Sequence, residues 1–345
     1  MNRRFLASLF IAIIFGVGAS STRGQAPDPS RRPPVLRSAG TAEGRAQSSA
    51  PRQTSPGALI TVPAVVMDRN GRYVGNLRKE DFHIYEDGVE QNLAYFASVE
   101  KPFTVALMLD VSGSTKYQLD QIREAANTFV SRLRYNDRLL ALTFDGKINL
   151  LTDVADVRTI RQSKLHIPTI TDGTVLYDAV DFTLKRMTQI PGRKAIVLMT
   201  DGVDQSSAAT FQSTIAEIAE QDVLIYTVRY NTLPQLPQRL SFIKNEKARR
   251  KVEQRLLKGY AVSEPYLKTL AEKTGGRFYK ADDLRDVGPA FEAITAELGV
   301  QYSLGYYARE GSANGERAIK VRVRYPNLVV RARDSYATAP AIARQ

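Results

Sequence analysis

The alternation of apolar runs with amphipathic stretches between residues 103 and 299 constrains the fold of this chain more than any other feature. The runs KAIVLMT (194–200) and DVLIYTV (222–228) are almost uninterrupted in apolar residues. Such runs are typical of strands whose two faces are both covered by helices. A further pair, 138–144 and 148–152, is joined by Asp145-Gly146 and predicts a hairpin, because Asp-Gly is a favoured hairpin turn.

These patterns predict a Rossmann-like order of strands and helices. We expect strands at 103–110, 138–144, 148–152, 194–200, 222–229 and 277–280, and helices near 117–134, 156–165, 175–189, 206–220, 264–273 and 283–298. The predicted fold class is therefore α/β, with a doubly wound, mostly parallel six-stranded sheet and one antiparallel edge strand. We assign residues 100–299 to this domain.

Both flanks of the α/β domain have β patterns. In residues 58–99, apolar runs surround Asn70-Gly71 and Asp87-Gly88, which are strong hairpin signals. In residues 300–336, apolar and basic residues alternate along AIKVRVRYP, which predicts a half-buried strand with a basic outer face. We expect the two segments to form a small β module, whether or not they share one sheet, and residues 337–345 to be a tail.

The chain begins with the features of a secretory signal. Arginines precede an apolar run at residues 5–17, and small residues follow at 18–21. We expect residues 1–21 to be a signal peptide, with an uncleaved anchor as the alternative. The mature protein would then be extracytoplasmic, periplasmic or secreted, without a transmembrane span. Residues 22–57 are rich in Pro, Ser and Arg and predict a disordered linker.

The composition excludes several kinds of site. The chain has no cysteine and two histidines, so disulfides, iron–sulfur clusters, thiol catalysis and cysteine–zinc sites are ruled out, and multi-histidine metal sites are disfavoured. The net charge of +12 comes from residues 1–57 and 236–260, each with eight basic and two acidic residues. Because the rest of the chain is balanced in charge, we expect no nucleic-acid binding, which needs a basic face on the fold.

Three loops place oxygen-bearing side chains at strand ends or helix starts. They contain, in turn, Asp110, Ser112 and Ser114; Asp172 and Thr174; and Asp201. In a doubly wound sheet the carboxyl ends of the strands form the ligand crevice, at the point where strand order reverses. Asp110 and Asp201 would then lie close together, which is costly without a proton or a cation between them. The all-oxygen set favours Mg²⁺, with Mn²⁺ or Ca²⁺ as alternatives, over zinc or copper.

The pattern Asp-x-Ser-x-Ser, with a threonine in the second loop and Asp-Gly in the third, resembles the metal-ion-dependent adhesion site of von Willebrand factor A-type domains over about residues 100–300. The resemblance implies that Ser112, Ser114 and Thr174 bind the cation directly through their hydroxyls. It implies that Asp110 and Asp201 bind partly through water, and that one coordination position is left for a carboxylate of a partner protein. The flanks resemble those of secreted bacterial VWFA-related proteins.

Two further acids near these loops have two interpretations each. Asp172 stands where the family often has glycine, and Asp204 follows the third loop. Either residue can accept hydrogen bonds in the outer shell of a metal. Alternatively, each caps a helix, since aspartate is common at helix starts.

An insertion at residues 231–262 separates the fifth strand of the domain from the next helix. Ala248, Val252 and Leu256 recur every four residues and predict a helix that ends near Gly259. A candidate patch for an anionic partner, such as an anionic envelope polymer, consists of Arg249, Arg250, Lys251 and Arg255. A solvated helix without a partner is the alternative.

The sequence therefore favours a secreted, non-catalytic binding or adhesion module that captures an exposed Asp or Glu carboxylate of a partner protein through a divalent cation. The alternatives are a subunit or scaffold of an envelope protein complex and a metal-dependent hydrolase that uses Asp110. Against the hydrolase, no second aspartate lies two residues after Asp110, and neither histidine lies near the three loops. The chain also lacks the G-x-x-x-x-G-K-[ST] loop of nucleotide hydrolases. We expect no catalytic residue.

Overall fold

The structure is a computed structural model that describes residues 59–98, 101–168, 173–282, 286–308 and 315–337. The chain divides into two units, Met1–Gln53 and Thr54–Gln345, and the described residues all belong to the second. The predicted signal peptide and linker, Asp172 and all but the first residue of the predicted tail lie outside the described residues.

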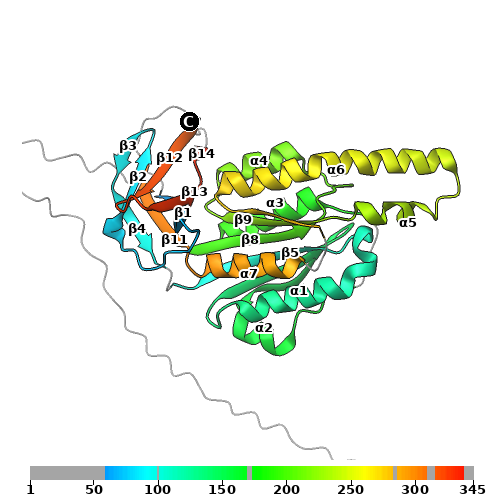
Figure 1. The fold of residues 1–345 in the computed structure, drawn as a ribbon, viewed down its shortest axis with the longest axis horizontal. Helices are drawn as coiled ribbons and strands as arrows, with labels where there is room; N and C mark the ends of the chain where they lie inside the picture. Colours follow the sequence, from blue (N-terminus) through cyan, green and yellow to red (C-terminus); the bar gives the residue numbers. More distant parts are fainter. Residues whose placement is uncertain (1–58, 99–100, 169–172, 283–285, 309–314, 338–345) are drawn as a thin grey trace, which may run out of the picture. The chain divides into compact units, whose positions relative to one another are not determined.

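A six-stranded sheet with the order β10-β9-β8-β5-β6-β7 forms the centre of the α/β domain. Its strands are β5 (Phe103–Asp110), β6 (Arg138–Phe144), β7 (Ile148–Asp156), β8 (Arg193–Thr200), β9 (Leu224–Tyr230) and β10 (Phe278–Ala281). All neighbouring strands are parallel except β6 and β7, which form the predicted hairpin at the edge. The predicted fold class is confirmed (Figure 1).

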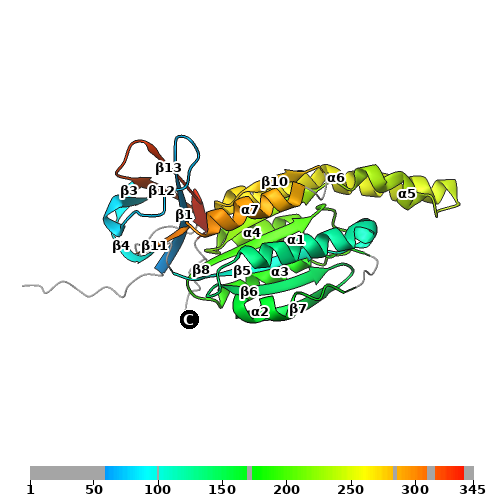
Figure 2. The same ribbon diagram turned by 60° about the horizontal axis from the view of Figure 1, so that its bottom comes forward.

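Helices cover both faces of the sheet because its inner strands are apolar on both sides. In β5, Val105 and Leu107 belong to one core, whereas Ala106 and Met108 belong to the other. The first face is covered by α1 (Leu119–Arg132), α2 (Val157–Ser163) and α7 (Val287–Leu298); the second is covered by α3 (Leu176–Thr188), α4 (Phe211–Ala219) and α6 (Glu246–Thr274) (Figure 1, Figure 2). Burial of these two apolar cores is the main favourable contribution to folding of the domain.

The flanking segments form a β module of two four-stranded sheets, with the orders β13-β1-β11-β4 and β14-β12-β2-β3. The strands are β1 (Leu59–Asp68), β2 (Phe82–Glu86), β3 (Val89–Gln91), β4 (Leu93–Ala97), β11 (Tyr302–Tyr307), β12 (Glu316–Val323), β13 (Leu328–Ala332) and β14 (Ser335–Ala337). Each sheet contains strands from both flanks, which answers the question that the sequence left open. The two sheets share one apolar core, which includes Val62, Ile84 and Leu304.

A buried carboxylate joins the β module to the α/β domain. Glu297, near the end of α7, is fully buried and accepts hydrogen bonds from the hydroxyls of Tyr226 on β9 (2.6 Å) and Tyr73 (3.0 Å). It also pairs with Arg331 on β13. A buried charge is tolerated only with such partners, so Glu297 connects three segments that are far apart in the sequence.

The prediction that the helix of the insertion ends near Gly259 is wrong. Helix α6 is continuous from Glu246 to Thr274 and ends at Gly275, whose φ of 79° is the left-handed conformation typical of a helix C-terminus. Gly259 serves close packing instead, because a Cβ at this position would lie 2.7 Å from Cγ1 of Val203.

The predicted apolar stripe of this helix is only partly correct. Leu256 is buried, whereas Ala248 and Val252 are exposed. The reason is visible in Figure 1, where the first turns of α6 extend beyond the carboxyl ends of the strands and lie beside α5 (Leu236–Leu240).

Candidate metal centre

Strand order reverses between β5 and β8, at the place where the predicted metal ligands lie. β5 pairs with β6 on one side and with β8 on the other, so the sheet grows outward in both directions from this pair. Asp110 is the last residue of β5, and Asp201 directly follows β8. The two acids therefore lie at the topological switch point, where ligands bind in doubly wound folds.

Asp110 is fully buried and uses both carboxylate oxygens in local hydrogen bonds. Its Oδ1 accepts a hydrogen bond from the amide of Ser112 (2.9 Å), and its Oδ2 accepts one from the hydroxyl of Thr200 on β8 (2.6 Å). Burial, followed by the charge of Asp201, raises the pKa of Asp110 to about 7, and these hydrogen bonds offset part of the increase. The carboxyl group therefore exchanges its proton near neutral pH.

Ser112 and Ser114 place two buried hydroxyls next to this carboxylate, with their Oγ atoms 2.9 Å apart. Ser112 keeps an extended backbone (φ −66°, ψ 170°) immediately before the short 3-10 helix η2 (Gly113–Gln118). The extended residue lets the chain present alternate side chains in the same direction before it turns. Each hydroxyl oxygen has two lone pairs, so it can bind a cation while its proton is donated elsewhere.

Thr174 is buried in the second loop and is tied to the segment that follows the third loop. Its carbonyl accepts hydrogen bonds from the amides of Gln205 (2.9 Å) and Ser206 (3.2 Å), and its Oγ1 accepts one from Nε2 of Gln205 (3.3 Å). The preceding Gly173 has a φ of 97°, and a Cβ there would lie 3.2 Å from Cα of Gly146. Glycine is therefore favoured by both the backbone conformation and the available space.

Asp201 is surrounded by hydrogen-bond donors that no sequence motif marks. Its Oδ1 accepts the amide of Val203 (3.1 Å), and its Oδ2 accepts the hydroxyl of Thr232 (2.7 Å) and lies 3.4 Å from the hydroxyl of Tyr260. Thr232 and Tyr260 belong to the insertion and are buried. Burial, followed by the charge of Asp201, raises the pKa of Tyr260 to about 12, so its hydroxyl keeps its proton at neutral pH.

Asp204 links the segment after the third loop to the start of α3. Its carboxylate accepts the amide of Tyr177 (3.3 Å) at the start of α3, and it accepts both the amide (3.3 Å) and the hydroxyl (2.5 Å) of Ser207. Asp178 holds the same loop from α3, by accepting the amide of Ala209 (2.7 Å). These contacts favour the capping interpretation of Asp204 over a place in the outer shell of a metal.

The residues at this edge of the sheet fit a hard divalent cation. Among the described residues, no group of three or more histidine, cysteine, aspartate or glutamate side chains is placed to hold a metal ion. A cation here would therefore be held by two carboxylates together with hydroxyls, an all-oxygen set that suits Mg²⁺, Mn²⁺ or Ca²⁺. It would also offset the burial of Asp110 and the charge of Asp201, which together raise the pKa of Asp110.

The basic residues singled out in the insertion lie on the first turns of α6. Arg249 and Arg250 both pair with Glu246 at exposed positions (2.8 and 2.9 Å), and Lys251 is exposed. Arg255 donates a hydrogen bond to the carbonyl of Gln205 (2.6 Å). Exposed ion pairs contribute little to stability, so the fold does not depend on the charges of Arg249 and Arg250.

An apolar pocket of about 540 Å³ opens beside the loops of the candidate centre. It is lined by Tyr177 and Phe211, at the starts of α3 and α4, and by Val262 of α6. The ring of Tyr266 lies beneath, with its centroid 4.8 Å from that of Tyr177 and 5.1 Å from that of Phe211. The same edge of the domain therefore carries a polar cluster and an apolar hollow.

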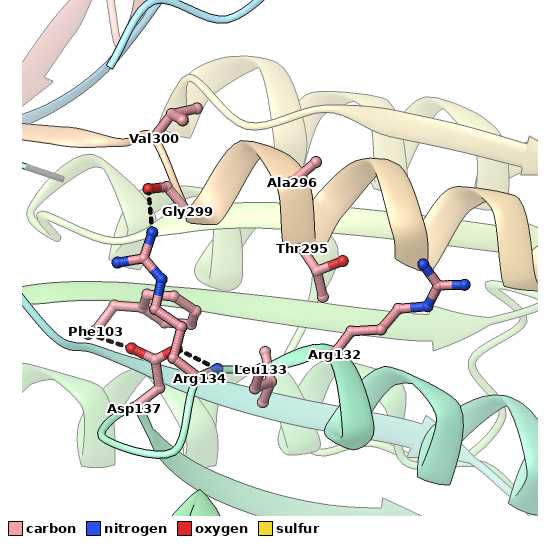
Figure 3. A pocket seen from close by; sticks show the side chains of 9 residues that line it. All are labelled: Phe103, Arg132, Leu133, Arg134, Asp137, Thr295, Ala296, Gly299 and Val300. Atoms are coloured by element: carbon pink, nitrogen blue, oxygen red, sulfur yellow. Dashed lines mark hydrogen bonds between the residues drawn. The ribbon is translucent and has the colours of Figure 1, made fainter. Parts of the chain in front are cut away.

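A second cavity, of about 270 Å³, lies at the opposite edge of the sheet, where β5 begins and α1 and α7 end (Figure 3). Arg134 donates to the carbonyl of Gly299 (2.8 Å), and Asp137 accepts the amides of Phe103 (3.2 Å) and Arg134 (2.8 Å). Because these polar groups hold α1, α7 and β5 together, we assign this cavity to packing.

Several proteins of known structure are similar to this chain. Among solved structures, the chain is similar to a von Willebrand factor type A protein from Catenulispora acidiphila, with 9% identity over 83% of this chain and 75% of that chain and a TM-score of 0.42. It is similar to the ArnB paralog VWA2 from Sulfolobus acidocaldarius, with 14% identity over 75% of this chain and 76% of that chain and a TM-score of 0.43. It is also similar to the vWF domain of the type V pili tip protein Mfa5 from Porphyromonas gingivalis, with 13% identity over 61% of this chain and 98% of that chain and a TM-score of 0.39.

No curated protein matches the chain. The family model of the von Willebrand factor type A domain matches residues 104–293, which is more than half of the chain and runs from the start of β5 into α7. The chain therefore belongs to the von Willebrand factor type A domain family.

Proposed function

We propose that this chain is a non-catalytic binding module that captures a carboxylate of a partner protein through a divalent cation. Domains of its family are typically binding or adhesion modules. The observation that carries the proposal is the pair of buried acids, Asp110 and Asp201, at the reversal of strand order. Two buried carboxylates close together are costly in free energy, and a cation between them would offset that cost.

The cation is Mg²⁺ in this proposal, with Mn²⁺ or Ca²⁺ as alternatives, and its ligands are Asp110, Ser112, Ser114, Thr174 and Asp201. When bound, it supplies a positive charge with one coordination position for an Asp or Glu carboxylate of the partner. The chain's own hydrogen bonds orient the ligands beforehand, from Thr200 to Asp110 (2.6 Å) and from Thr232 to Asp201 (2.7 Å). Preorganisation of this kind lowers the entropic cost of binding.

The geometry favours docking over hydrolysis. Among the described residues, His83 pairs with Glu90 in the β module (2.7 Å), and His166 is exposed. Neither is among the hydrogen-bond partners of Asp110 or Asp201. Since domains of this family are usually non-catalytic, we propose that the chain is not an enzyme.

The place of action in this proposal is outside the cytoplasm, either the periplasm or the cell exterior, because residues 1–21 have the pattern of a secretory signal. In the part of the chain that the structure describes, no helix combines the length and apolar character that crossing a bilayer requires. An anionic envelope polymer would bind the patch formed by Arg249, Arg250, Lys251 and Arg255. A subunit or scaffold of an envelope protein complex would use the same cation site toward a permanent neighbour.

Calorimetric titration of Mg²⁺ into chelator-treated protein tests the cation site. We expect one site per chain, absent in the double variant Ser112→Ala/Ser114→Ala and retained in the control Ser131→Ala, which changes an exposed helix serine. No heat of binding to the wild-type protein would contradict the proposal.

Affinity capture from an envelope extract tests the docking role. We expect partners to be retained in Mg²⁺ and released by a chelator, and Asp201→Ala to retain none of them. Turnover of model phosphate or ester substrates that disappears in Asp110→Ala would instead establish a hydrolase and overturn the proposal.

A further inference from the structure

The insertion forms an arm that packs on the third loop of the candidate centre. Residues 231–262, which we call the arm, comprise η3 (Leu233–Gln235), α5 and the first half of α6, and they extend beyond the carboxyl ends of the strands (Figure 1, Figure 2). The arm shares a small apolar core with that loop, made of Val203, Leu236, Leu240, Leu256 and Tyr260. Val203 lies two residues after Asp201, so the arm is anchored directly beside a proposed metal ligand.

Thr232 and Tyr260 connect this core to the carboxylate of Asp201. Thr232 donates its hydroxyl proton to Oδ2 of Asp201 (2.7 Å), and its oxygen contacts the hydroxyl of Tyr260. Arg239 donates to the oxygen of Tyr260 (3.3 Å). Each hydroxyl has one proton to donate. Because Thr232 donates its proton to Asp201, the Tyr260 hydroxyl is the donor in the contact with Thr232. The result is a chain of hydrogen bonds that starts on α5 and ends on Asp201.

A second connection joins the arm to Thr174. Arg255 donates to the carbonyl of Gln205 (2.6 Å), and Gln205 donates from Nε2 to Oγ1 of Thr174 (3.3 Å). The third loop is also tightly packed against α6 directly after the arm, since a Cβ on Gly202 would lie 2.6 Å from Cβ of Ser263. The arm therefore contacts the third loop and the segment after it directly, and it reaches the second loop only through Gln205.

The outer surface of the arm is basic and carries exposed apolar side chains. Phe242, in the turn between α5 and α6, is 76% exposed, and Leu257 is 46% exposed. Residues 236–260 contain eight basic and two acidic side chains. The sign of this charge favours an anionic partner.

We infer that Thr232 and Tyr260 are positioning residues of the cation site, and that they link cation binding to the position of the arm. The inference rests on the proposed function, because it requires a cation at Asp201. A bound cation attracts the same Asp201 carboxylate that accepts the hydrogen bond of Thr232. Cation binding therefore changes the strength of the hydrogen bond that holds the arm. By thermodynamic reciprocity, releasing the arm changes the affinity for the cation. An anionic partner of the arm would then meet a surface whose placement depends on the cation.

Hydroxyl-deletion variants test the link with Mg²⁺ as the probe. Thr232→Val and Tyr260→Phe each remove one hydroxyl and keep the buried shape. We expect the Kd for Mg²⁺, measured by calorimetry, to rise about tenfold in Thr232→Val, because hydrogen bonds that orient a metal ligand affect affinity by about 10- to 100-fold. The rise should be smaller in Tyr260→Phe, because Tyr260 acts on Asp201 through Thr232. Tyr266→Phe is the matched control: its buried hydroxyl on the same helix donates to Thr214 (3.1 Å), and its Kd should match the wild type.

Hydrogen exchange of the wild-type protein provides a readout that needs no substitution. We expect Mg²⁺ to change the exchange rates of backbone amides in residues 236–262, and this change to be absent in Thr232→Val. Arm amides that exchange at the same rate with and without Mg²⁺, or variants that bind Mg²⁺ like the wild type, would overturn the inference and leave the proposed function standing. A wild-type protein that binds no Mg²⁺ would overturn both.

Discussion

At the residue scale, the energetics of the site depend on Asp110. Its pKa of about 7, raised first by burial and then by Asp201, lies above the ordinary value of 3.8. When the pKa of an acid is higher in the folded protein than in the unfolded chain, the free energy of unfolding falls as the pH rises from the unfolded to the folded pKa. Without a cation, the contribution of Asp110 to stability should therefore fall as the pH rises from about 4 to 7, and the loss should be complete above pH 7.

Neutralising this carboxylate should stabilise the protein in the presence of a chelator. At pH 8, Asp110→Asn should raise the free energy of unfolding by about 2 kcal/mol, because the amide carries no charge but accepts fewer hydrogen bonds. At pH 5 the difference should be small, since the wild-type carboxyl is then mostly protonated. Urea unfolding at both pH values measures the effect. Asp120→Asn, at an almost fully exposed position, is the control, and a variant no more stable than the wild type at pH 8 would argue against a buried charge.

Protons and the cation should compete for Asp110. Because the carboxyl must lose its proton to act as a ligand, the Kd for Mg²⁺ should be about tenfold higher at pH 6 than at pH 8. Calorimetric titrations at the two pH values measure the ratio. Equal affinities would mean that Asp110 is ionised throughout this range.

At the element scale, helix α6 shows where sequence patterns are sufficient and where they are not. The inner strands β5, β6, β8 and β9 were predictable because each is a largely apolar run of its own. Gly259 was misassigned as a helix end, because the sequence does not show that Val203 packs against it. Thr232 and Tyr260 were missed for the same reason: no motif marks them, and only tertiary packing brings them to Asp201.

Close packing at Gly259 should outweigh the better helix propensity of alanine. Gly259→Ala places a Cβ 2.7 Å from Cγ1 of Val203, and we expect it to lower the free energy of unfolding by about 1 to 3 kcal/mol. Gly288→Ala in α7, where a Cβ would meet nothing within 4 Å, should be neutral or stabilising. Thermal unfolding of the two variants checks this contrast. Equal stability of the two variants would show that the arm adjusts freely.

At the scale of the whole molecule, the sequence predicted the arrangement of the α/β domain and the β module only in part. The fold class follows from local patterns, and the five proposed ligands follow from the resemblance of the three loops to the metal-ion-dependent adhesion site. Membership of the two sheets in the β module does not, because β1 pairs with β11 and β13, more than 200 residues away. The contact through Glu297 was likewise beyond prediction, since its partners come from β9, β13 and the first hairpin region.

Removing the charge of Glu297 should destabilise the protein strongly. Glu297→Gln leaves the partly buried Arg331 without its carboxylate partner, and we expect a loss of about 3 kcal/mol in the free energy of unfolding. Glu292, also on α7, forms an exposed ion pair with Arg132. Glu292→Gln breaks this pair and should lower the free energy of unfolding by less than about 1 kcal/mol. Chemical denaturation of both variants gives the comparison. Similar losses of stability in the two variants would contradict the role of Glu297 in connecting the α/β domain to the β module.

The central claim is that the ends of β5 and β8 and the second loop hold one divalent cation. Anomalous diffraction from crystals soaked in MnCl₂ tests it most directly. The account predicts a single manganese peak surrounded by Asp110, Ser112, Ser114, Thr174 and Asp201. Crystals soaked in saturating manganese that show only solvent among these five side chains would contradict it.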